Sequence, residues 1–363
     1  MSTRQEGTGL RYGWTTGACA TASAAAAYTA LLTGEFPDPV EIVLPKGHRP
    51  AFALAREQLE PGVATAGVVK DAGDDPDVTH GALVSATVRH AEPGRGVVFR
   101  AGPGVGTVTK PGLPLEVGEP AINPVPRRLI REVITRVAAA HGGTGDVVVE
   151  VSIDDGEELA RRTWNPRLGI LGGLSVLGTT GVVVPYSCSA WIDSIRRGVD
   201  VARAEGLTHV AGCTGSTSEK VVVQHYGLPT EALLDMGDFA GAVLKYLRRH
   251  PVPRLTVAGG IGKISKLADG HLDLHSKRSQ VDFAALADIV RAPGGDALAE
   301  RVASANTALD ALRICTEVDV PLGDLVAARA REVCRTTLRE APVAVDVLVI
   351  DRAGTVVGHA LPD

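Results

Sequence analysis

Residues 255–266 read LTVAGGIGKISK, an apolar segment followed by three glycines and two lysines. Leu255–Ala258 has the composition of a buried strand, and the glycines after it are typical of a turn with accessible backbone N–H groups. A turn of this kind binds phosphate or carboxylate when cations stand on it, here Lys263 and Lys266. An ordinary strand-to-helix connection with solvated lysines is the structural alternative.

This stretch does not satisfy the requirements of a nucleotide P-loop. That motif needs a glycine five residues before its Gly-Lys pair and a Ser or Thr directly after the lysine, whose hydroxyl binds Mg²⁺. Val257 and Ile264 stand at those two positions. The sequence therefore disfavours a small-molecule kinase, and the anion expected here is not a nucleotide triphosphate.

The residues around this stretch alternate between expected strands and expected helices. We expect strands at 208–213, 255–258 and 345–350, and helices at 190–205, from 216, 239–249, 283–290, 297–302, 307–318 and 325–339. Such alternation predicts a Rossmann-like α/β domain with a mainly parallel sheet and ligands at the carboxyl ends of its strands. If strands 208–213 and 255–258 are neighbours, the segment 214–219 lies beside the lysines. Ser216 and Glu219 have capping-box spacing there.

The first half of the chain has a different pattern, typical of an α+β domain. We expect helices at 18–32, capped by Thr15 or Thr16, and at 126–140, with strands at 40–44, 51–59, 65–69, 83–89, 96–100 and 146–153. The Gly- and Pro-containing segment near Asn165–Gly173 is the expected boundary. This gives an α+β domain over residues 1–165 and a Rossmann-like α/β domain over residues 166–363.

Composition narrows the classes of function. The 363 residues are 45% hydrophobic, enough for one large domain or two ordinary ones. With 37 basic and 42 acidic residues and only 4% aromatic residues, we expect no nucleic-acid partner. No uncharged stretch is long enough to cross a bilayer, so we expect no membrane partner. Five scattered cysteines without a CxxC motif are typical of reduced thiols, which indicates a cytoplasmic protein.

Two further loops are rich in glycine. Residues 169–181, GILGGLSVLGTTG, contain more glycine than a structural helix would, so either a cofactor loop or tight backbone packing explains them. Residues 101–112 lack the last glycine of GxGxxG, since Thr107 stands there, which excludes a dinucleotide loop. Lys110 lies on this rigid segment. Arg127 and Arg128 follow at the expected start of a helix, where an anionic partner or solvent would accommodate them.

Histidine and cysteine motifs do not indicate a metal or a nucleophile. His271 and His275 have the spacing of helical metal ligands, but Gly270 interrupts the segment and no HExxH-type glutamate is present, so we expect no metal. A hydrogen-bonding or anion-binding role suits His275, Ser276 and Lys277 better. Cys19 lies in the first turn of an expected helix, and without an assignable histidine partner a small packed cysteine is the favoured interpretation.

Taken in order, the loops resemble the cobalt-precorrin-5B C1-methyltransferases of the cobalt-early, anaerobic cobalamin pathway. The resemblance rests on five motifs: GWTTGACA at 13–20, GVGTVTKPGLP at 104–114, GEPAINPVPR at 118–127, LGTTG at 177–181, and GKISKLA at 262–268 with His275-Ser276 after it. It implies an enzyme that takes a methyl group from S-adenosylmethionine, acts on cobalt-precorrin-5B and forms cobalt-precorrin-6A. Cobalt would enter only as part of the substrate.

The expected ligand suits the residues of these loops, because a precorrin is an apolar macrocycle fringed with carboxylates that cations and N–H groups can bind. We predict that the substrate contacts are Lys110, Arg127, Lys263, Lys266, His275, Ser276 and Lys277. For the methyl donor we predict Gly178, Thr179, Thr180, Gly181, Gly215 and Ser216. No catalytic residue is assigned. A tetrapyrrole carrier without catalysis is the competing class, and assembly into homo-oligomers and transient contact with neighbouring pathway enzymes are open.

Overall fold

The computed structural model describes residues 9–362, and the chain divides into two compact units between Cys188 and Ser189. This division lies later than the boundary expected at residues 165/166. Residues 166–188 lie in the first unit because their short strands pair with strands of that unit: β13 (Val182–Val183) with β1 (Gly13–Trp14), β11 (Ile170–Leu171) with β9 (Thr107–Val108), and β12 (Gly173–Leu174) with β8 (Gly104–Val105). Pairing between distant segments is not visible in local composition.

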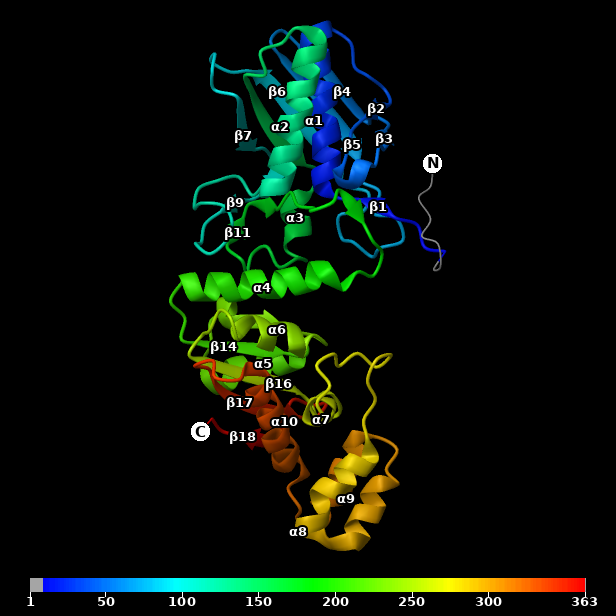
Figure 1. Ribbon diagram of the computed structural model, residues 1–363, viewed down its shortest axis with the longest axis vertical. Helices are drawn as coiled ribbons and strands as arrows, with labels where there is room; N and C mark the ends of the chain where they lie inside the picture. Colours follow the sequence, from blue (N-terminus) through cyan, green and yellow to red (C-terminus); the bar gives the residue numbers. More distant parts are fainter. Residues whose placement is uncertain (1–8, 363) are drawn as a thin grey trace. The chain divides into compact units, whose positions relative to one another are not determined.

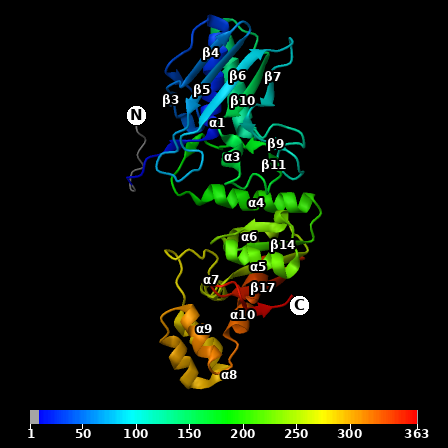
Figure 2. The ribbon, with the colours of Figure 1, turned by 180° about the vertical axis from the view of Figure 1, so that it is seen from behind.

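The first unit is a five-stranded sheet with two long helices on one face. The strand order is β4-β5-β6-β10-β7, and only β10 and β7 are parallel. The bounds are β4 Arg56–Glu60, β5 Val63–Val69, β6 Leu83–His90, β7 Val97–Ala101 and β10 Val147–Ile153. Helices α1 (Thr16–Thr33) and α2 (Pro124–His141) lie side by side on the sheet in Figure 1, and Figure 2 shows the opposite face. The remaining elements of this unit are β2 Val40–Glu41, η1 Pro45–Gly47, β3 Ala51–Phe52 and α3 Gly156–Ala160.

Helix α1 is buried almost all round, because β5 and β6 of the sheet, helix α2 and strand β2 all pack against it. Its first turn is capped by Thr15, whose hydroxyl accepts from the Ala18 N–H at 3.2 Å, and Gly34 ends it in the left-handed conformation. Alanines occupy most of the buried positions, so neighbouring backbones can approach closely. The structure thus confirms the helix expected at 18–32 and one of its two expected caps.

The second unit is built on a mixed five-stranded sheet of order β15-β14-β16-β17-β18. The first four strands are mutually parallel and β18 is antiparallel to β17. The bounds are β14 His209–Cys213, β15 Leu233–Asp235, β16 Arg254–Gly260, β17 Ala344–Ile350 and β18 Val356–Ala360. The expected strands at 208–213, 255–258 and 345–350 are confirmed, whereas β15 and β18 were not anticipated.

Helices cover both faces of this sheet unequally. Alternate strand residues such as Val210 and Val257 pack against helices on one face, while Ala211 and Ala258 pack with Val222 of α5 on the other. The bounds are α4 Cys188–Ala204, α5 Ser216–Tyr226, η2 Thr230–Ala232, α6 Ala240–Leu247, α7 Ile261–Ala268, α8 Phe283–Ala303, α9 Ala308–Thr316 and α10 Leu322–Leu338. Among these helices, only α5 lies on its face; α4, α6, α7 and α10 share the opposite one.

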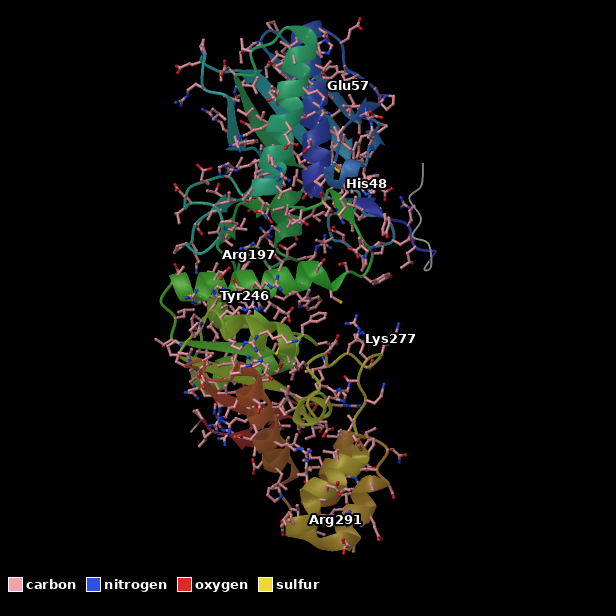
Figure 3. All side chains as sticks on the ribbon, in the orientation of Figure 1. His48, Glu57, Arg197, Tyr246, Lys277 and Arg291 are labelled. Carbon is pink, nitrogen blue, oxygen red and sulfur yellow. The ribbon has the colours of Figure 1, made fainter. Side chains whose placement is uncertain are left out.

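Two details complete the second unit. Residues 283–303, labelled α8, are two helical segments that meet at a kink, where Gly295 is not helical and Pro293 lies just before it, in agreement with the break expected between residues 290 and 297. Figure 1 shows α8 and α9 packed together beyond the sheet. Arg197 of α4 and Tyr246 of α6, labelled in Figure 3, both contact Asp200, at 3.6 Å and 2.7 Å.

In residues 9–362, no helix combines the length and apolar character that crossing a bilayer requires.

Candidate functional site

The carboxyl ends of β14 and β16 form the main candidate site, in the second unit. The two strands are neighbours, with Cys213 paired to Ala258. The chain leaves β14 towards α5 on one face of the sheet and leaves β16 towards α7 on the other. A point where successive connections diverge to opposite faces is the usual ligand-binding place of an open α/β sheet. The prediction that the two segments lie side by side is confirmed.

Lys263 occupies the centre of this switch point. Its Nζ donates to the backbone oxygen of Thr214, after β14, at 3.0 Å, and lies 3.1 Å from Oδ1 of Asp238, after β15. Gly259 leaves room for the Thr214 side chain, since a Cβ at Gly259 would lie 2.7 Å from it. An ammonium group donates up to three hydrogen bonds. Lys263, whose side chain is 38% exposed, can therefore bind an anion while it keeps both of these contacts.

The glycine-lysine stretch is more helical than expected. Strand β16 continues to Gly260 and α7 begins at Ile261, so Lys263 and Lys266 stand on a helix rather than on a turn. Lys266 is only 8% exposed, and its Nζ donates to the backbone oxygen of Leu274 at 2.9 Å. The structure thus shows Lys266 holding the following loop; contact of Lys266 with a substrate remains a prediction.

The loop that Lys266 holds contains the predicted histidine, serine and lysine. His275, Ser276 and Lys277 are all exposed, and Figure 3 shows Lys277 on this loop. Nδ1 of His275 accepts from the Lys277 N–H at 3.2 Å, which orients the ring. His271 and His275 lie outside any helix, so the helical ligand spacing considered from sequence does not exist here. Among the described residues, no three His, Cys, Asp or Glu side chains are grouped to hold a metal ion.

The start of α5 differs from the expected capping box. Gly215 is the N-cap residue, and Ser218, not Glu219, closes the first turn: its Oγ accepts from the Gly215 N–H at 3.2 Å and donates to the Gly215 oxygen at 2.7 Å. Ser216 is instead the first helical residue and is exposed. The first turn of α5 therefore presents backbone N–H groups and a hydroxyl at the carboxyl end of β14.

In the first unit, the predicted donor loop 177–181 packs against the start of α1. The Gly17 N–H donates to the Leu177 oxygen at 2.9 Å and the Thr15 N–H donates to the Gly181 oxygen at 3.0 Å. Gly178 has φ +134°, and a Cβ there would lie 2.3 Å from Oγ1 of Thr15. Tight packing, one of the two explanations left open, accounts for these glycines.

The other members of this loop are Thr179, which is exposed, and Thr180, which is half-buried. The Thr180 hydroxyl lies 3.3 Å from both the nitrogen and the oxygen of Val182, so it closes a local turn. The binding of the methyl donor by residues 178–181 remains a prediction.

Arg127 is also engaged within the protein. Its guanidinium donates to the backbone oxygens of Ile122 and Pro120, at 2.7 and 2.9 Å, and to Oε2 of Glu119 at 2.7 Å. These contacts fasten the proline-rich segment to the first turns of α2. The stem of Lys110 fills the space beside Gly169, where a Cβ would lie 2.5 Å from its Cγ. Substrate contacts of Arg127 and Lys110 remain predictions.

Sequence reasoning missed a polar cluster beside α1, formed by residues 70–80 with Arg11. Lys70 is 1% exposed and its Nζ donates to Oδ2 of Asp77 at 2.7 Å. Arg11 makes a two-pronged ion pair with Asp71, and Asp75 Oδ1 accepts from the Tyr186 N–H at 2.8 Å. The signal that could have revealed it was the segment KDAGDDPD, with a lysine and four aspartates in eight residues.

Cys19 lies near this cluster and confirms the packed interpretation. It is fully buried in α1, and burial raises the pKa of its thiol to about 12 even though the Lys70 charge opposes the shift. A neutral, inaccessible thiol cannot act as a nucleophile at neutral pH.

These features define a two-unit α/β protein whose second unit presents a lysine and two helix starts at the switch point of its sheet. The family model described as CbiD matches residues 3–185, and the one described as CbiD, C-terminal domain, matches residues 273–360. The chain belongs to the CbiD family, which confirms the resemblance seen in its motifs.

Curated relatives extend this similarity over nearly the whole chain. Proteins named cobalt-precorrin-5B C(1)-methyltransferase are 62% identical in Paramagnetospirillum magneticum, covering 97% of this chain and 98% of the relative, and 60% identical in Rhodospirillum rubrum, covering 99% of each. One from Brucella anthropi is 58% identical, covering 98% and 97%. A crystal structure described as cobalamin biosynthesis protein from Archaeoglobus fulgidus is 27% identical, covers 68% of this chain and 76% of its own, and has a TM-score of 0.40.

Proposed function

We propose that the chain transfers a methyl group from S-adenosylmethionine to C1 of cobalt-precorrin-5B and so forms cobalt-precorrin-6A in cobalamin biosynthesis. The observation that carries this proposal is the identity of 62%, 60% and 58% to three proteins of that name. Each alignment covers at least 97% of both chains, so the relatives include both units and all the loops described above.

The chemistry requires positioning more than it requires a reactive side chain. The S–CH₃ bond of the sulfonium breaks, a C1–CH₃ bond forms, S-adenosylhomocysteine leaves and the macrocycle loses one proton. Holding two reactants in line lowers the activation barrier by roughly 7–11 kcal/mol. A thiol nucleophile is not needed, in agreement with the buried, neutral Cys19.

We infer that the second unit works as a Rossmann-like domain that binds the methyl donor. Its strands β14 to β17 are parallel and lie in the order β15-β14-β16-β17, which creates a switch point beside β14. Nucleotide-type ligands bind at such points in doubly wound sheets. The antiparallel β18 extends the far edge of the sheet and does not alter the switch point.

For the corrinoid substrate, we propose that the exposed cations and hydrogen-bonding groups bind the peripheral carboxylates. Lys277, His275 and Ser276 stand on an exposed loop, which suits contact with a large ligand. Lys266 and Arg127 already hold loops of the protein, and we assign them the role of keeping those loops in place for the substrate. Lys110 remains a candidate on the rigid loop of the first unit.

We also propose a cytoplasmic location. The five cysteines are all free thiols, and four of them are buried, as in proteins of reducing compartments. Homo-oligomers and transient contacts with neighbouring pathway enzymes are further proposals, which light scattering and pull-down with those purified enzymes would test.

The test of the reaction is a methyl-transfer assay. Purified protein receives S-adenosylmethionine with a labelled methyl group and cobalt-precorrin-5B made in situ by the upstream enzymes. We expect the label at C1 of the macrocycle. A macrocycle that binds the protein without acquiring label would refute the methyltransferase and favour a tetrapyrrole carrier.

A further inference from the structure

The methyl donor has two ends that require different partners. Its nucleoside end carries the ribose hydroxyls, which donate hydrogen bonds to a carboxylate, and a flat adenine, which binds against an aromatic surface. Its amino-acid end carries a carboxylate, which cations and helix N–H groups bind, and an ammonium, which a carboxylate binds. A site for the whole molecule must supply both sets at a fixed separation.

Asp235 has the position of a ribose-binding acid. It is the last residue of β15, and it pairs with Cys213, the last residue of β14. In Rossmann-type domains, an acid at the end of the second strand, about 20 residues after the glycine turn that follows the first strand, binds the ribose hydroxyls. In this unit β14 is the first strand, Gly215 lies in the turn after it, and Asp235 stands at that distance at the end of the second strand.

An aromatic pair stands beside Asp235. Nε1 of Trp191 donates to the backbone oxygen of Asp235 at 2.8 Å, and the ring centroid of Trp191 lies 6.2 Å from that of Phe239. Gly237 leaves room for the Trp191 ring, because a Cβ there would lie 3.1 Å from it. Trp191 is 41% exposed. The end of β15 thus combines a carboxylate with a flat aromatic surface, which are the two partners that a nucleoside needs.

The partners for the amino-acid end come from the segments that follow the three strands: Lys263 after β16, Asp238 after β15, and the first turn of α5 after β14. Lys263 and Asp238 form an ion pair at 3.1 Å, and the first turn of α5 adds N–H groups. Lys263 thus reaches over the end of β14, and its pair with Asp238 lies three residues along the chain from Asp235.

We propose that the methyl donor lies across the carboxyl end of β14, with its ribose on Asp235, its adenine against Trp191, and its amino-acid group at Lys263 and Asp238. This placement rests on the proposed function. It makes the carboxylate of the donor, rather than one of the substrate, the anion bound by Lys263. The glycine loop 177–181 of the first unit is then left to its packing role against α1.

The test compares two variants with two ligands in the methyl-transfer assay. S-Adenosylhomocysteine carries both ends of the donor, whereas 5′-methylthioadenosine lacks the amino-acid group, and both are used as competitive inhibitors. We expect Asp235→Asn to raise KM for S-adenosylmethionine and both inhibition constants roughly 10- to 100-fold, the loss of a charged hydrogen bond. Lys263→Met should raise KM and the constant for S-adenosylhomocysteine similarly, and leave that for methylthioadenosine unchanged.

The control variants distinguish the loss of a donor contact from misfolding, and the wild-type activity tests the reaction itself. Asp288→Asn removes an exposed carboxylate of α8, paired with Arg291 at 3.4 Å, and should leave every constant within twofold. Asp235→Glu should recover part of the affinity that Asp235→Asn loses, which a merely misfolded variant would not do. The placement is overturned if either variant keeps the wild-type KM, or if Lys263→Met also weakens inhibition by methylthioadenosine. Neither of these results would contradict the methyl-transfer activity. Absence of transfer by the wild-type protein overturns the proposed function itself.

Discussion

The ion pair between Lys70 and Asp77 allows a test of how burial determines the stability of the first unit, because the two side chains are buried to different extents. The Lys70 side chain is 1% exposed, while that of Asp77 is 26% exposed and also accepts from the N–H and hydroxyl of Thr79 at 2.8 and 2.6 Å. Asp77→Asn leaves an ammonium in the core without its counter-charge. Lys70→Met leaves the Asp77 carboxylate partly exposed to solvent and still hydrogen-bonded twice by Thr79.

The expected losses follow from this asymmetry. Removing one partner of a buried pair costs about 3–5 kcal/mol, because the other charge stays desolvated. Asp77→Asn should therefore lower the free energy of unfolding of the first unit by about 3–5 kcal/mol. Lys70→Met should lower it by roughly 1–3 kcal/mol, the cost of an unsatisfied but partly solvated group. The double variant should be less destabilised than the sum of the two.

Urea unfolding measures these losses. Trp191→Phe, introduced into the wild-type background and into each variant, removes the tryptophan of the second unit, so fluorescence reports Trp14 and Trp164 of the first. Glu41→Gln is the matched control, since its pair with Arg49, at 2.6 Å, is exposed and should contribute about 0–1 kcal/mol. A loss in Lys70→Met equal to or greater than that in Asp77→Asn would refute the reasoning.

Three further predictions concern the same unit. Burial alone raises the pKa of Asp77, but the Lys70 ammonium and the hydrogen bonds from Lys70 and Thr79 outweigh it and hold the pKa below its usual value. The ionised carboxylate therefore stabilises the fold at a pH above the unfolded pKa of about 3.9, and this stabilisation is lost as the pH falls through the folded pKa. The thermal unfolding temperature between about pH 5 and pH 2 should accordingly depend on pH less in Asp77→Asn than in the wild type. Cys19 should resist iodoacetamide at pH 8 in the folded protein and react after unfolding in urea, as mass spectrometry of its peptide would record; rapid labelling of the native protein would contradict its burial and its pKa of about 12. Gly178→Ala should cost about 2–4 kcal/mol, from positive φ and overlap with Thr15, whereas Gly34→Ala, with positive φ but open space, should cost about 1–2 kcal/mol in the same urea experiment, and equal losses would show that overlap contributes nothing.

Long periodic segments were predictable because local signals agree with tertiary burial. The apolar positions of α2, among them Leu129, Ile130, Val133 and Ile134, are the buried ones. Strand β10 buries every second residue, and the residues of β14 and β16 after the first of each strand are nearly all buried. By contrast, β15 has three residues, too few for a period to appear. Helix α7 begins with Ile-Gly-Lys, and glycine at its second position suggested a turn. Its helical state comes from packing of Ile264 and Leu267 in the core.

The sequence by itself determined the family, through five ordered motifs, and the order of most helices and strands. It also placed the segment 214–219 beside Lys263 on the condition that strands 208–213 and 255–258 are neighbours, because strand ends of a parallel sheet meet at one edge. Only the tertiary structure decided that Lys266 and Arg127 hold loops, that glycines 178 and 181 allow packing, and that Asp235 stands beside Trp191. The contacts of a side chain depend on segments far away in the chain, and local composition carries no record of them.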